Sequence, residues 1–199
     1  MRQLVCLVLA AVAASTAMAQ THPACGGEHH YRWAQKADTS FAAAAVETTT
    51  VGAILAHWAP PSITQANWCT PRTEPERHVY TLVGWVRFVK DETNDNDWHI
   101  ELTSSRTSPP TSCIVAEIPS DDYGQLFASV RDSFLTVSGL SDVRQKGDTI
   151  RPPVKVRVTG TAFYDGWHRG SNGANGHGHC NKSARALWEI HPVYRIEHP

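Results

Sequence analysis

The 199-residue sequence lacks the features that would identify several common classes of protein. Beyond the N-terminus it has no apolar run of the ~20 residues that a membrane-spanning helix needs. Lysine and arginine form no cluster and the formal net charge is −1, which disfavours non-specific binding to nucleic acid. CxxC, HExxH and GxSxG motifs are also absent, so no sequence motif identifies catalytic residues and they stay unknown.

The first 19 residues have the pattern of a secretory signal peptide. Arg2 supplies the charged start, residues 4–14 form a short apolar run, and residues 17–19 (Ala-Met-Ala) form a small-residue cleavage site. We therefore expect an exported protein, periplasmic or secreted. Cleavage would remove one basic residue and no acidic one, which changes the net charge to −2.

Cysteine is scarce, and one of the five cysteines falls within the signal peptide. An even number of cysteines in an exported chain favours disulfide bonds, and four allow three pairings. We expect two disulfides, with the pairing open, among Cys25, Cys69, Cys113 and Cys180.

Hydrophobic patterning divides the mature chain into two parts. Residues 20–76 are expected to be a helical and loop segment, with a short helix over 51–58 that ends before two prolines. Residues 77–199 are expected to form a more regular, mainly β domain. Its expected strands are 78–90, 98–103, 113–118, 154–164 and 187–196.

One helix is expected between the third and fourth of these strands. Asp121 or Asp122 can cap its start, apolar residues at helical spacing continue to Phe134, and Gly139 lies near its end. Three strands, a helix and two strands is the order of an OB-fold, so the sequence predicts a five-stranded OB-like barrel. A β-sandwich would need about seven strands.

Histidine lies beside an acidic residue in three segments of the second half of the chain. Because residues two apart in a strand share a face, His99 should lie beside Glu101, and His191 beside Glu189. Asp165 and His168 form a third pair. The apolar residues between them should face the core, which leaves a polar site of imidazoles and carboxylates.

Five segments, RWAQK, DNDWHIEL, VAEIP, FYDGWH and WEIHPV, resemble in the same order those of a widespread uncharacterised family of exported bacterial proteins. The resemblance covers most of the mature chain and is most specific in the C-terminal WEIHPV motif. It implies one exported β-barrel domain and no particular activity. It also implies recurrent family positions for His99, Glu117, Asp165, His168, Glu189 and His191.

Neutral imidazole and carboxylate are the usual ligands of zinc and similar divalent metals. The candidate metal ligands are His99, Asp165, His168 and His191, and the same groups could serve acid–base chemistry. The competing interpretation is structural. In that interpretation, these side chains occupy the solvated faces of half-exposed strands or close a turn.

Two further features offer other sites. His177 and His179 lie in a glycine-rich loop before Cys180, where we expect adventitious metal binding, so His191 is the preferred site residue. Of the seven tryptophans, Trp167 is the best candidate for an exposed stacking surface, because Trp98 and Trp188 have the phase of core residues.

The sequence thus supports two functions. The preferred one is a module that binds an unknown small ligand or oligomer on the barrel face, with ligand-binding candidates His99, Glu101, Glu117, Trp167, His168, Glu189 and His191. The alternative is a metal-dependent hydrolase, nuclease- or phosphodiesterase-like, that uses the same cluster. Such an enzyme would also need arginines near the carboxylates, and the sequence does not place Arg87 or Arg157 there.

Overall fold

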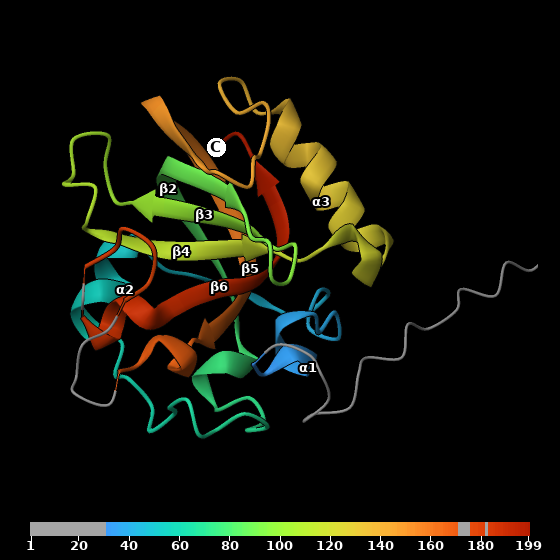
Figure 1. Ribbon diagram of the computed structural model, residues 1–199, viewed down its shortest axis with the longest axis vertical. Helices are drawn as coiled ribbons and strands as arrows, with labels where there is room; N and C mark the ends of the chain where they lie inside the picture. The colour runs from blue at the N-terminus through green and yellow to red at the C-terminus, as the bar shows by residue number, and fades with distance from the viewer. Residues whose placement is uncertain (1–30, 171–175, 182) are drawn as a thin grey trace, which may run out of the picture.

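The computed structural model describes residues 31–170, 176–181 and 183–199, and these residues form mainly β-sheet with a few helices (Figure 1). The expected signal peptide and Cys25 lie outside the described residues. Within the described ranges, no helix is long and apolar enough to cross a membrane.

The N-terminal part contains short elements: α1 (Trp33–Lys36), β1 (Val46–Thr48) and α2 (Val51–His57). Helix α2 confirms the short helix expected at 51–58. It begins where the hydroxyl of Thr50 accepts a hydrogen bond from the backbone N–H of Ala53 at 3.0 Å, which satisfies one of the free amides of its first turn.

Five longer strands follow, and all five expected strands are present. They are β2 (Val79–Asp91), β3 (Trp98–Thr103), β4 (Cys113–Ile118), β5 (Asp148–Tyr164) and β6 (Trp188–Glu197). The expected strand count of five is wrong, because β1 adds a sixth strand parallel to the start of β2. All three residues of β1 are exposed, so no alternation of apolar and polar residues marks it.

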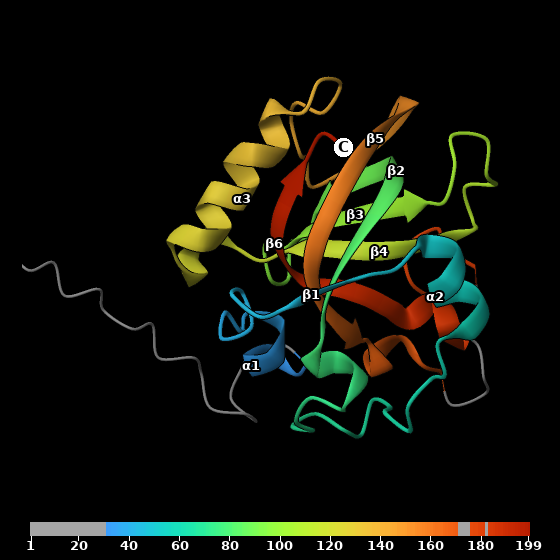
Figure 2. The ribbon, with the colours of Figure 1, turned by 180° about the vertical axis from the view of Figure 1, so that it is seen from behind.

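The strand pairings form a ring. Strand β2 pairs with β3, β3 with β4, β4 with β6, β6 with β5, and β5 returns to β2. All of these pairings are antiparallel except that of β4 with β6, which is parallel. Figure 2 shows the long, curved strands β2 and β5 side by side. Consequently β3, β4 and β6, which carry most of the candidate residues, are consecutive neighbours.

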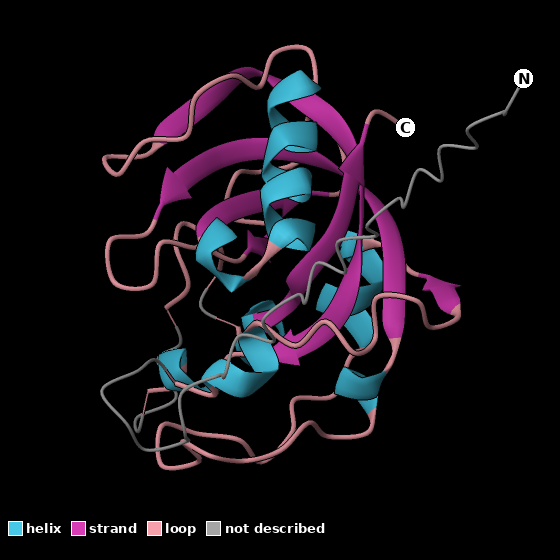
Figure 3. Cartoon of the chain, turned by 90° about the vertical axis from the view of Figure 1, so that its right-hand side faces the viewer, coloured by secondary structure: helices cyan, strands magenta, loops and turns pink. Residues whose placement is uncertain are grey.

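Helix α3 (Gln125–Thr136) lies between β4 and β5 in sequence, as expected, and packs beside β6 and β4 (Figure 3). Its buried face consists of Phe127, Val130 and Phe134. The expected aspartate cap is wrong. Asp121 and Asp122 belong to a separate 3-10 turn capped by Ser120, and α3 starts after Gly124.

Strand β5 starts six residues earlier than the sequence indicated, because Pro152 and Pro153 lie within it. Short 3-10 turns occupy Pro75–Arg77, Gly166–His168 and Ala184–Leu187. In the core, Ile100 and Leu102 of β3 meet Trp188 and Ile190 of β6. The apolar faces of these strands are therefore as expected, and their polar residues point the other way.

Candidate functional site

A pocket of about 460 Å³ lies on the polar side of β3 and β4. Its histidines and two of its four carboxylates come from β3, β4, the turn after β5 and the segment 176–181. They are His99, Glu117, Asp165, His168 and His177, with Glu92 and Asp95 from the turn between β2 and β3. The pocket thus collects ionisable groups from parts of the chain far apart in sequence.

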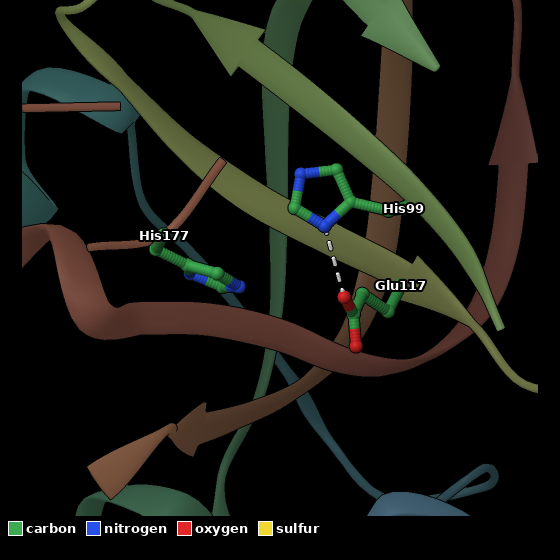
Figure 4. A group of neighbouring side chains, drawn as sticks. All are labelled: His99, Glu117 and His177. Carbon is green, nitrogen blue, oxygen red and sulfur yellow. Dashed lines mark hydrogen bonds and ion pairs between the residues drawn. The ribbon is translucent and has the colours of Figure 1, made fainter. Parts of the chain in front are cut away.

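Three of these side chains form a group that could hold a metal ion (Figure 4). One ligand atom from each of His99, Glu117 and His177 lies within 4.8 Å of the others, and all three residues are buried. His99 Nδ1 lies 3.1 Å from Glu117 Oε1. A second group of three, Asp165, His168 and His177, meets the same limit and shares His177, on which the His168 ring stacks at 4.8 Å.

Strand register explains how His99 and Glu117 meet. They are directly paired residues on the antiparallel strands β3 and β4, so their side chains lie on one face. His177 comes from the segment 176–181, which two contacts hold against these strands. Cys180 forms a disulfide with Cys113 at the start of β4, and the backbone N–H of His179 donates to Glu101 at 2.7 Å.

Behind the pocket wall lies a fully buried polar network centred on His191. Its Nδ1 lies 2.9 Å from Glu117 Oε2 and 3.2 Å from Glu189 Oε2, and its Nε2 lies 3.2 Å from Asp97 Oδ2. His177 Nε2 lies 3.1 Å from the other oxygen of Glu189. One network of contacts therefore runs from His177 through Glu189 and His191 to Glu117.

The two pocket histidines have opposite electrostatic surroundings. Burial disfavours the charged ring of His99, but its bonds to Glu101 and Glu117 outweigh this and raise its pKa to about 10. Burial, together with the nearby His99, lowers the pKa of His177 to about 3. His177 is therefore neutral near pH 7 and offers a lone pair, whereas His99 must release a proton before it can bind a metal.

One lysine reaches the site. Lys36 Nζ lies 3.9 Å from Glu117 Oε2 and 3.8 Å from Asp95 Oδ2. Burial disfavours the ammonium of Lys36, but Glu117 and other carboxylates outweigh it and raise its pKa, so it stays charged. For Glu117 the burial penalty is likewise overcome, chiefly by Lys36 and His191, and its pKa falls well below the usual value. Glu117 is thus an ionised carboxylate beside two imidazoles.

Most of the sequence-predicted residues meet in this region. His99, Glu117, Asp165, Trp167 and His168 line the pocket. Glu101 lies behind His99, with 3.5 Å between its Oε1 and the ring Nε2. Glu189 and His191 contact each other as expected, but both are completely buried and do not line the pocket.

Two expectations need correction. The interpretation of His99, Glu101, Glu189 and His191 as solvated strand faces is wrong, because all four are buried. The second correction concerns His177, which the sequence assigned to a glycine-rich loop of little importance and which lies at the centre of the site. The available signal was Cys180, three residues later, whose disulfide ties this segment to β4.

The disulfide expectation is confirmed for one pair, Cys113–Cys180. Cys69 is also disulfide-bonded. Comparison of the chain with protein-family models, curated proteins and solved structures finds no match. The interpretation of the site therefore rests on its own geometry.

Proposed function

We propose that the chain is an exported binding module whose pocket holds one divalent metal ion, zinc-like in its preferences, on His99, Glu117 and His177. The observation that carries the proposal is the convergence of two imidazoles and one carboxylate within 4.8 Å. With metal–ligand bonds of ~2.0–2.1 Å, the ligand atoms of a tetrahedral zinc site lie roughly 3.3 Å apart. Small side-chain movements would bring the three ligand atoms from within 4.8 Å of one another to this spacing.

Unpaired polar atoms at the site support a missing partner. In the described part of the chain, the buried Nδ1 of His177 makes no hydrogen bond, and the buried Nε2 of His99 has only a 3.5 Å contact with Glu101 Oε1. Buried ring nitrogens are normally paired, and exceptions commonly indicate a bound ion or water. A metal ion would accept the lone pair of a histidine nitrogen and would compensate the negative charge of Glu117.

The framework fits a binding function. The ring of pairings from β2 to β5, the parallel pairing of β4 with β6 and the helix between β4 and β5 favour an OB-like barrel. Such folds host many ligands, so the fold supports the class of function and no particular ligand. We also propose that the chain is exported and that it is related to the family of exported bacterial proteins that end in a WEIHPV-like motif.

The alternative, a nuclease- or phosphodiesterase-like hydrolase, has less support. Three protein ligands do leave a coordination position for water, as in catalytic zinc sites. However, Arg87 donates to the backbone carbonyls of Arg106 and Ser108, and Arg157 lies 3.4 Å from Glu197, so neither lines the pocket. Lys36 is the one Lys or Arg side chain among the described lining residues, and it already contacts Glu117 and Asp95.

A metal titration tests the proposal. Protein stripped with a chelator is titrated with zinc against a chromophoric competitor, using wild type, His177→Ala and His179→Ala. We expect one zinc per wild-type chain and a loss of affinity of more than about 100-fold for His177→Ala, since loss of a ligand should exceed the ~10–100-fold cost of losing an outer partner.

His179→Ala is the matched control, because it keeps the backbone N–H that donates to Glu101 and removes a largely exposed ring that contacts Glu101 at 3.0 Å but does not line the pocket. It should bind zinc within a few-fold of wild type. Absence of zinc binding by wild type, or equal binding by His177→Ala, would exclude this site.

A further inference from the structure

Next to the metal-ligand candidates, the pocket has an aromatic wall, which consists of Tyr31, Trp68 and Trp167. Their ring centroids lie 5.4–6.0 Å apart, and the Trp68 ring meets each of the other two edge to face. Rings this close fill the space between them, so they form a wall rather than a cage around a cation. The wall offers one exposed ring, that of Trp167, which is 44% exposed.

The backbone of Trp167 is fixed on both sides despite this exposure. Its backbone N–H donates to Asp165 Oδ1 at 2.9 Å, and its carbonyl accepts from Gln65 Nε2 at 2.7 Å. The second oxygen of Asp165 lies 3.4 Å from His168 Nε2. An exposed tryptophan on a fixed turn loses little entropy on binding, and Asp165 connects it directly to the ionisable cluster.

The charge of the pocket restricts what can bind against this wall. Four carboxylates line it, those of Glu92, Asp95, Glu117 and Asp165, against the single ammonium of Lys36. One divalent ion would still leave these lining groups with a net negative charge, which disfavours a phosphate or sulfate group. The same carboxylates, with the Asn94 amide, are good partners for hydroxyl groups.

We propose that the second ligand of the pocket is a neutral carbohydrate, with one pyranose ring stacked on Trp167 and its hydroxyls bound to carboxylates of the lining. The apolar C–H face of a sugar matches an indole ring, and its hydroxyl edge matches carboxylates and amides. The volume of about 460 Å³ is within the ~300–1,000 Å³ of small-molecule sites. The inference rests on the proposed function in that both ligands share one pocket.

The test is isothermal titration with cellotriose, chitotriose and maltotriose, alongside adenosine monophosphate and choline as charged probes. Each is titrated into wild type with zinc and after chelation, so the sugar result stands whether or not zinc binds. We expect saturable binding of at least one trisaccharide and weaker or no binding of both charged probes. Binding should be at least about tenfold weaker in Trp167→Ala and largely retained in Trp167→Phe.

Leu135→Ala is the matched control, because Leu135 on α3 is 43% exposed and does not line the pocket. It should bind sugar like wild type, and Trp167→Ala should bind zinc like wild type. The proposal is overturned if no trisaccharide binds, if adenosine monophosphate or choline binds more tightly, or if Trp167→Ala keeps full sugar affinity. Failure of zinc binding in wild type would instead overturn the proposed metal site alone.

Discussion

Nδ1 of His191 lies 2.9 Å from Oε2 of Glu117 on the neighbouring strand, and this contact joins the buried interior to the pocket wall. Glu117 in turn directs its other oxygen to His99. His191 thereby positions Glu117 without reaching the pocket itself. Partners of this kind orient the groups that bind metals.

Replacement of His191 should therefore destabilise the fold. His191→Ala would leave the carboxylates of Asp97, Glu117 and Glu189 buried without their shared partner, a change that typically costs about 3–5 kcal/mol. Urea unfolding of metal-free protein measures it. His198→Ala, an exposed control, should stay within about 0.5 kcal/mol of wild type. A cost for His191→Ala below about 1 kcal/mol would contradict a structural role.

Gly178 should be required for the position of the segment that carries His177. Its φ is +54°, and a Cβ there would collide with Glu101 Oε1 and lie 2.8 Å from His99 Nε2. Gly178→Ala should thus displace the segment and weaken zinc binding by at least about tenfold. Gly176→Ala is the matched control, because a Cβ at Gly176 meets nothing within 4 Å. Equal zinc affinity in the two variants would show that the segment tolerates displacement.

The Cys113–Cys180 disulfide should support both stability and metal binding. It fixes Cys180, whose backbone N–H donates to the carbonyl of His177 at 3.1 Å. A double Cys113→Ala, Cys180→Ala variant should lose about 2–4 kcal/mol of stability, measured by thermal or urea unfolding. Its zinc affinity should also fall, because ordering His177 would then oppose binding. Reduced stability with unchanged zinc affinity would separate the disulfide from the site.

The buried carboxyl of Glu189 should make stability depend on pH. Burial, and then the negative charge of Glu117, raises its pKa from 4.5 to about 8. A carboxyl with a raised folded pKa contributes most below its unfolded value, and this contribution is lost as pH rises from about 4.5 to 8. In metal-free protein, Glu189→Gln should therefore gain stability relative to wild type as pH rises over this range, by up to about 1.4 kcal/mol per pH unit. A stability difference that stays constant across this pH range would refute the assignment.

The alternation of apolar and polar residues was sufficient to predict the strands that carry the site. The alternation in β3 and β6 placed Ile100 and Ile190 in the core and joined His99 to Glu101 and His191 to Glu189. Alternation separates two faces of a strand, and it does not say whether the polar face meets solvent. Here the segment 176–181 and the N-terminal residues around Lys36 lie against that face. The burial of its polar residues was therefore not predictable from the alternation of apolar and polar residues alone.

The position of His177 depends on tertiary structure. A glycine-rich stretch has no period, and tertiary contacts such as the Cys113–Cys180 disulfide hold it beside β4. With three pairings open, the sequence could not place it. The pairing of β1 was equally hidden, since three exposed residues carry no pattern.

Anomalous diffraction at the zinc edge, from crystals grown with one equivalent of zinc, would locate the bound metal. We predict one dominant peak in the pocket, about 2 Å from a ring nitrogen of His99, a ring nitrogen of His177 and an oxygen of Glu117. A dominant peak on the exposed His57 or the half-buried His78, with none between these three side chains, would contradict this site.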